Sequence, residues 1–139
     1  MSAETFFRIL FGLIAIGTTI YLIAGLLTCR TRVGRRTVER HVEPRLFWAA
    51  LGKSAILATG LAVGVIQPSD DIRLHIVFLG LFSGQLFEML ASGIVQMPSA
   101  AFSKDTQPKR YWPWVAFHAA LVLLILAFLI AQRFRPIIL

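Results

Sequence analysis

Glu88 and Lys53 are ionisable side chains near the middle of long apolar stretches of this chain, where a charge is costly. Glu88 lies in the segment GLFSGQLFEMLASG, residues 80–93, and Lys53 lies in the apolar segment that precedes it. A charge at the centre of a bilayer costs roughly 3 kcal/mol or more unless it is paired or faces water. The two residues therefore predict either an ion pair between helices or a site for a proton, an ion or a substrate.

Both charges share a helix face with glycines that are spaced four residues apart. These glycines are Gly60 and Gly64, of which Gly60 lies about two turns beyond Lys53, and Gly80 and Gly84, on the face of Glu88. Small residues let membrane helices approach closely, so we expect the two faces to meet. At a rise of ~1.5 Å per residue the two charges reach nearly the same depth. The spacing therefore predicts that Lys53 and Glu88 form a pair.

Two further polar residues extend the predicted intramembrane cluster. His118 lies ~8 Å from the start of the last apolar stretch, at a depth similar to that of the pair. Gln85 is a residue type that commonly forms hydrogen bonds between membrane helices. The predicted cluster is Lys53, Glu88, Gln85 and His118, and both a structural role and a role in transport are open for it.

Composition places these residues in a membrane protein. The 139 residues are 57% hydrophobic and 15% charged, and the mean hydropathy is +0.73, values that ordinary soluble domains do not show. Four apolar stretches, at about residues 6–28, 46–66, 72–97 and 113–131, each reach the roughly 20 residues that a helix needs to cross a bilayer. We expect an all-α integral membrane protein with one transmembrane domain, residues 1–139, folded as a four-helix bundle. No internal repeat is evident, which gives an inverted-repeat transporter no support.

Basic residues are concentrated in two of the connections between these stretches. The first connection contains Arg30, Arg32, Arg35, Arg36, Arg40 and Arg45, and the third contains Lys104, Lys109 and Arg110. The opposite side has only Arg8, Arg73, Arg133 and Arg135. By the positive-inside rule the first and third connections are cytoplasmic, and both termini lie on the non-cytoplasmic side. We expect the protein in the bacterial cytoplasmic (inner) membrane.

The first connection, called the basic loop below, decides which partners we expect. A short basic stretch beside a helix end is what topology requires, and it also attracts anionic lipid headgroups, so we expect no nucleic acid partner. Cys29 is the only cysteine, which rules out a multi-cysteine metal cluster. The chain also lacks a phosphate-binding glycine loop and the metalloprotease motif HExxH. We therefore expect neither a metal nor a cofactor, and soluble-enzyme chemistry has no support.

Part of the third apolar stretch resembles a known family. The segment HIVFLGLFSGQLFE runs from His75 through Gly84 to Glu88 and is similar in spacing to a segment of some bacterial MAPEG proteins, which are membrane glutathione-dependent enzymes. The expected layout of four helices, external termini and a basic first cytoplasmic loop is also similar. The resemblance implies a membrane enzyme that acts on a lipophilic substrate. The chain departs from the family at Gln85, where the family has an arginine, and in VERHVEPR, which lacks the family's arginine and asparagine pattern.

Three functions are open from the sequence. We expect a non-enzymatic membrane subunit that packs with other membrane helices, in a homo-oligomer or as an accessory subunit of a larger complex, because the chain has two close-packing faces and no catalytic motif. The first alternative is a small ion or solute transporter or channel that uses Lys53, Glu88 and His118. The second alternative is the MAPEG-like enzyme.

Overall fold

The computed structural model describes residues 2–67, 70–97 and 99–138 and contains four long helices. They are α1 (Ala3–Thr28), α2 (Pro44–Ile66), α3 (Asp70–Ser92) and α4 (Pro108–Ile138). Each is long and apolar enough to cross a membrane. The predicted helical fold with four candidate spans is confirmed.

Several helix ends differ from the predicted ranges, and two of these ends flank the second hairpin. α3 ends at Ser92 rather than at residue 97, because Gly93 has a φ of +71° and its N–H donates to the Met89 carbonyl, a common way to terminate a helix. α4 begins at Pro108 rather than at residue 113, because proline suits the first position of a helix. Hydropathy marks the part of a helix that fits the membrane, and the helix itself starts and stops according to its own backbone.

The first and third connections, expected as loops, each contain a short antiparallel hairpin. The strands are β1 (Arg30–Val33) with β2 (Arg36–Glu39), and β3 (Ile94–Gln96) with β4 (Ala101–Ser103). Val33 and Val38 of the first hairpin are buried against Phe47 of α2, and Val95 of the second is buried against Tyr111 of α4. Apolar side chains thus attach each hairpin to the helix that follows it.

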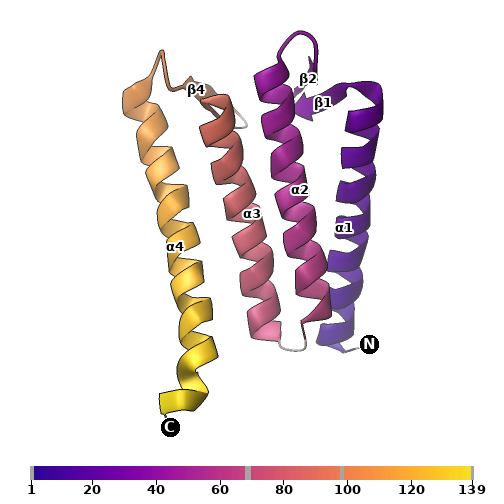
Figure 1. Ribbon diagram of the computed structural model, residues 1–139, viewed down its shortest axis with the longest axis vertical. Helices are drawn as coiled ribbons and strands as arrows, with labels where there is room; N and C mark the ends of the chain where they lie inside the picture. The colour runs from indigo at the N-terminus through magenta and orange to yellow at the C-terminus, as the bar shows by residue number, and fades with distance from the viewer. Residues whose placement is uncertain (1, 68–69, 98, 139) are drawn as a thin grey trace.

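The four helices lie side by side in chain order (Figure 1). Both hairpins are at one end of the molecule, and both chain termini are at the other. Contacts between helices join α1 to α2, α2 to α3 and α3 to α4, and the α2–α3 contact is the most extensive. The order helix, hairpin, helix therefore occurs twice along the chain, an internal repetition that the sequence did not reveal.

The α2–α3 contact brings two backbones together at glycines. A Cβ added to Gly60 would lie 2.8 Å from the Cα of Gly80, and one added to Gly80 would lie 2.9 Å from the Cα of Gly60. A Cβ added to Gly64 would lie 2.7 Å from Val77 Cγ2, and one added to Gly84 would lie 3.0 Å from the carbonyl oxygen of Lys53. All four glycines of the predicted packing faces thus lie within this one contact.

Gly60→Ala tests this contact. Because the added methyl group meets backbone, the two helices must move apart, and such overpacking costs about 1–3 kcal/mol. The free energy of unfolding in detergent should fall by that amount. Gly17→Ala is the control, since its Cβ would meet nothing within 4 Å and alanine favours the helix. Equal losses for the two variants would contradict the proposed importance of the glycine contact.

Candidate functional site

The structure brings Lys53 of α2 and Glu88 of α3 together. Lys53 Nζ lies 2.5 Å from Glu88 Oε2. Gly84 lies one turn before Glu88, and a Cβ there would be 3.0 Å from the Lys53 carbonyl oxygen and 3.3 Å from its Cγ. The absence of a side chain at Gly84 therefore leaves the space in which the lysine stem lies.

The two partners differ in burial. The Glu88 side chain is 4% exposed and the Lys53 side chain is 32% exposed. Among the described residues, no donor reaches the buried Glu88 Oε1. A buried acceptor without a partner costs about 1–3 kcal/mol, and more when it is charged. The hydrogen bonding of this carboxylate is therefore incomplete within the described part of the chain.

The other two residues of the predicted cluster lie apart from the pair. The Nδ1 atom of His118 lies 2.9 Å from the Trp114 carbonyl oxygen, and its ring is next to the ring of Phe82 of α3. Gln85 is partly buried one turn before Glu88. Neither side chain forms a hydrogen bond with the pair in the part of the chain that the structure describes. His75, on the other side of α3, stacks on Phe128 of α4 with ring centroids 4.0 Å apart.

Arg73 is a site residue that the sequence analysis missed, because it was counted only as a surface charge. Its side chain is 1% exposed. The guanidinium donates to the carbonyls of Gly64 and Gln67 at 3.1 and 2.6 Å, and Glu4 of α1 lies 3.6 Å away. The last carbonyls of a helix have no partners within it and carry partial negative charge. Arg73 thus caps α2 from the first turn of α3, and its place just after a connection that is short in sequence is the signal that could have indicated this.

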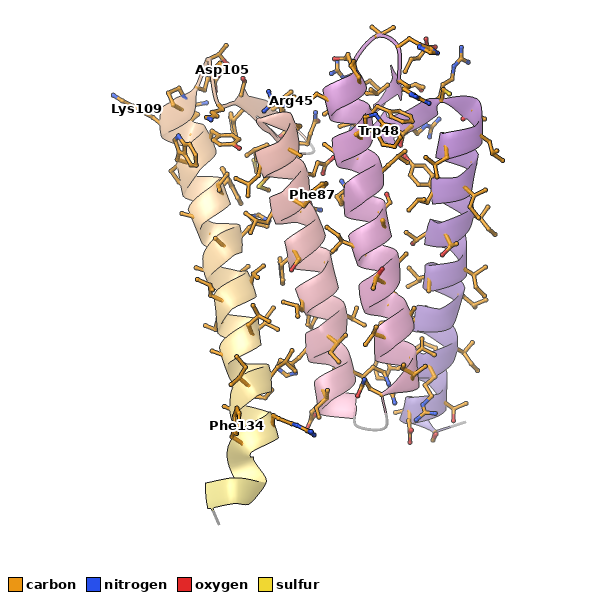
Figure 2. The ribbon with its side chains drawn as sticks, in the orientation of Figure 1. Arg45, Trp48, Phe87, Asp105, Lys109 and Phe134 are labelled. Carbon is orange, nitrogen blue, oxygen red and sulfur yellow. The ribbon has the colours of Figure 1, made fainter. Side chains whose placement is uncertain are left out.

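Arg45 has the matching role at the hairpin end. Its Nε donates to the Ala91 carbonyl at 2.6 Å, so an arginine at the start of α2 caps the end of α3. Figure 2 shows Arg45 and Trp48 at this end of α2, far from Phe134 near the opposite end of α4. The central helices are therefore joined by an arginine at each end and by the ion pair between them.

Other arginines of the basic loop also have partners within the chain. Arg30 pairs with Glu39 at 2.9 Å, and Arg36 pairs with Glu43 at 2.8 Å. Arg40 lies over the Trp48 ring, 5.5 Å from its centroid. Arg32 and Arg35 are exposed, and within the described residues their side chains have no ion-pair partner. These two arginines are the ones available to an external anion.

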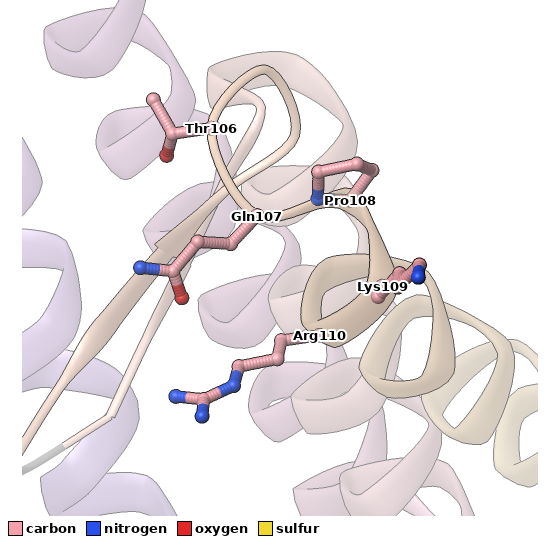
Figure 3. A pocket seen from close by; sticks show the side chains of 5 residues that line it. All are labelled: Thr106, Gln107, Pro108, Lys109 and Arg110. Carbon is pink, nitrogen blue, oxygen red and sulfur yellow. The ribbon is translucent and has the colours of Figure 1, made fainter.

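Several surface hollows lie at the hairpin end, and two of them have volumes near 500 Å³. One, of about 470 Å³, lies between the hairpins and is lined by Val33, Arg35, Arg36, Ile94, Gln96 and Ala101. The other, of about 500 Å³, lies at the start of α4 (Figure 3), where Gln107 and Arg110 extend to the same side and Lys109 extends away from them. Neither hollow is lined by Lys53 or Glu88. The ion pair is therefore separate from both.

The arrangement limits what chemistry this site can do. The free Glu88 oxygen can accept a hydrogen bond, and Lys53 can donate further ones from its exposed side. Within the described residues, no group of three or more His, Cys, Asp or Glu side chains could hold a metal ion. Neither a protein family, a curated protein nor a solved structure matches this chain.

Lys53→Met tests whether the pair stabilises the fold. Removing the lysine leaves a buried carboxylate without compensation, and such a change typically costs about 3–5 kcal/mol of unfolding free energy. The double variant Lys53→Met with Glu88→Leu removes both charges and should recover most of that loss.

The exposed pair Arg30–Glu39 supplies the control. Its side chains are 64% and 43% exposed, so Arg30→Met should cost no more than about 1 kcal/mol. A Lys53→Met protein as stable as the wild type would show that Glu88 does not need this partner.

Proposed function

We propose that this chain is a non-enzymatic, multi-pass membrane subunit that packs with other membrane helices, in a homo-oligomer or as an accessory subunit of a larger membrane complex. The observation that supports it is the incomplete hydrogen bonding of Glu88, whose Oε1 is buried without a donor among the described residues. Inside a bilayer, water is not at hand to satisfy such an atom. A polar side chain from another helix can satisfy it.

The exposure of Lys53 supports the same proposal. A third of its side chain is exposed within a helix that is apolar enough to span a membrane. Charged groups in such helices almost always face other helices or a water-filled cavity rather than lipid. Gln85, one turn from Glu88, is partly exposed and adds a second group able to bind a partner helix.

The two alternatives have less support from the geometry. A transport path through Lys53, Glu88 and His118 needs these three side chains to lie next to one another along the path. His118 packs instead against the rings of Phe82 and Trp114. A MAPEG-like enzyme needs a site for a thiol cofactor, and Gln85 stands where that family has an arginine. Both functions are outcomes that the partner experiment below can reveal.

The membrane orientation is part of the proposal. With the hairpins in the cytoplasm and both termini outside, the arginines of the basic loop follow the positive-inside rule, and Arg32 and Arg35 can contact anionic lipid headgroups. The corresponding location is the bacterial cytoplasmic membrane. Nucleic acid has no role in this proposal.

Cysteine labelling tests the orientation. In a Cys29→Ser background, Ser99→Cys at the exposed second hairpin should resist a membrane-impermeant reagent in intact cells, whereas Ser2→Cys at the exposed N-terminal end should react. Permeabilised cells should label at both positions. Free labelling of Ser99→Cys in intact cells would reverse the orientation.

Site-specific photo-crosslinking tests the partner. A photoreactive residue at Gln85 should form an adduct with a second copy of the chain or with another membrane protein in its native membrane. The same residue at Leu124, which is 68% exposed on α4, is the control and should yield no protein adduct. Native mass spectrometry of the extracted protein should show the same partner.

Other outcomes of that experiment would replace the proposal. A strictly monomeric protein without a protein adduct at Gln85 would contradict it. Liposome flux abolished by Glu88→Gln would then favour the transporter, and bound glutathione in the native mass spectrum would favour the enzyme.

A further inference from the structure

The two halves of the chain repeat one another at a constant spacing of 64 residues. Cys29 and Gly93, which are separated by this spacing, both have positive φ, +55° and +71°, and both follow directly after a helix. Pro44 and Pro108, separated by the same spacing, begin α2 and α4. The strand registers also correspond, with Thr31 opposite Val38 in one hairpin and Val95 opposite Phe102 in the other.

Hydrogen bonds at the helix ends follow the same spacing. The Thr28 hydroxyl donates to the carbonyls of Ala24 and Arg30, at 2.7 and 3.5 Å. The Ser92 hydroxyl donates to those of Glu88 and Ile94, at 2.6 and 3.2 Å. The N–H groups of Arg40 and Lys104 donate to the carbonyls of Cys29 and Gly93, at 2.9 and 2.8 Å. The backbone therefore follows the same path, with the same hydrogen bonds, where the chain leaves α1 and where it leaves α3.

Aromatic contacts at the start of α2 and α4 match in the same way. Phe47 and Trp48 have ring centroids 5.2 Å apart at 82°, and Tyr111 and Trp112 have them 5.2 Å apart at 83°. Arg40 lies 5.5 Å from the Trp48 centroid, and Lys104 lies 5.7 Å from the Trp112 centroid. The first ring of each pair is buried and the second is exposed. Correspondence at this many independent positions, without an insertion or deletion, indicates one structural unit used twice.

We infer that the chain is a tandem pair of one helix–hairpin–helix unit, and that the α2–α3 contact is a recognition surface between the first unit and the second. Both hairpins lie at the same end of the molecule (Figure 1), so the repeat is parallel rather than inverted. Each unit presents a different face to the other. The first unit contributes Lys53 and the second contributes Glu88.

Charge determines which partner each unit accepts. At the repeat spacing, Lys53 corresponds to Phe117 and Glu88 corresponds to Ala24. A first unit bound to another first unit would therefore place Lys53 opposite alanine, with no acid to compensate it. The occupant that fits the face of the first unit is the second unit, which carries the carboxylate and the capping residue Arg73.

Large side chains on the outer helices, α1 and α4, prevent a second contact like the one between α2 and α3. The positions equivalent to Gly80 and Gly84 are Ile16 and Ile20 on α1, and the position equivalent to Gly60 is Leu124 on α4. These three side chains are 59%, 61% and 68% exposed. A backbone contact like that of Gly60 with Gly80 cannot form where a large side chain projects. The outer faces of α1 and α4 therefore cannot bind a further unit through this type of close contact.

Cleavage of the folded, full-length chain tests this inference, which is independent of the proposed function. A protease site is inserted after Gln67, the two ends carry different tags, and the protein is cut after it has folded in mild detergent. Both halves should stay together through purification. Separation of the halves of the wild-type sequence after cleavage would overturn the inference.

Charge reversal shows whether recognition depends on the pair. Glu88→Lys should raise the rate at which the halves separate at least about tenfold, as should Lys53→Glu, because each places like charges together at a buried site. The combined Lys53→Glu and Glu88→Lys variant should restore association.

The milder Glu88→Gln and a control supply the remaining comparisons. Glu88→Gln should also speed separation, so the test does not depend on a reversal variant that folds poorly. Reversal of the exposed pair Arg30–Glu39, which lies within the first unit, should leave the separation rate unchanged. Unchanged rates for all three single variants at Lys53 and Glu88 would show that charge does not select the partner.

Discussion

The direct backbone contact between Gly60 and Gly80 fixes the geometry of the rest of the structure. A Cβ on either residue would lie within 3 Å of the other's Cα, so the spacing of α2 and α3 is determined by the absence of side chains. The helices are antiparallel and rise ~1.5 Å per residue, and fixing one contact therefore fixes the register along their whole length. Lys53 then meets Glu88 on one side of the glycines, and Arg73 meets the end of α2 on the other.

This register distributes polar contacts along an otherwise apolar interface. Lipid is as apolar as a leucine side chain, so burial of apolar surface does not by itself bring membrane helices together. In the proposed membrane setting, close backbone packing and polar contacts supply the attraction. Arg45 and Arg73 satisfy carbonyls at opposite ends of the central helix pair, where the helix dipoles favour a cation. The ion pair lies between these ends, and because desolvation offsets much of its attraction, its main proposed effect is on partner choice.

The sequence was sufficient to predict the helices, the two glycine faces and the contact of Lys53 with Glu88, because hydropathy and helical periodicity act within single helices. The sequence was not sufficient to predict that His118 lies apart from this pair, since periodicity does not tell how α4 is rotated relative to α3. Arg73 looked like a surface charge because it bonds to backbone carbonyls of another helix, which no residue type identifies, and only its place just after a short connection pointed to them.

The hairpins and the repeat were missed for related reasons. The strands are only three or four residues long, and those of the first hairpin are rich in charges that topology explains equally well. Identical residues at the repeat spacing are few, and they include Pro44 with Pro108 and Trp48 with Trp112. Elsewhere a membrane helix accepts nearly any apolar residue, so two segments with one backbone path can differ at most positions. The halves differ most consequentially where they meet: Lys53, Glu88 and the glycines occupy positions that hold large or uncharged residues in the other half. A repeated unit whose two copies had kept identical faces could associate without limit at both edges. Restricting the close contact and its charges to α2 and α3 leaves one complementary junction and two edges that cannot form it.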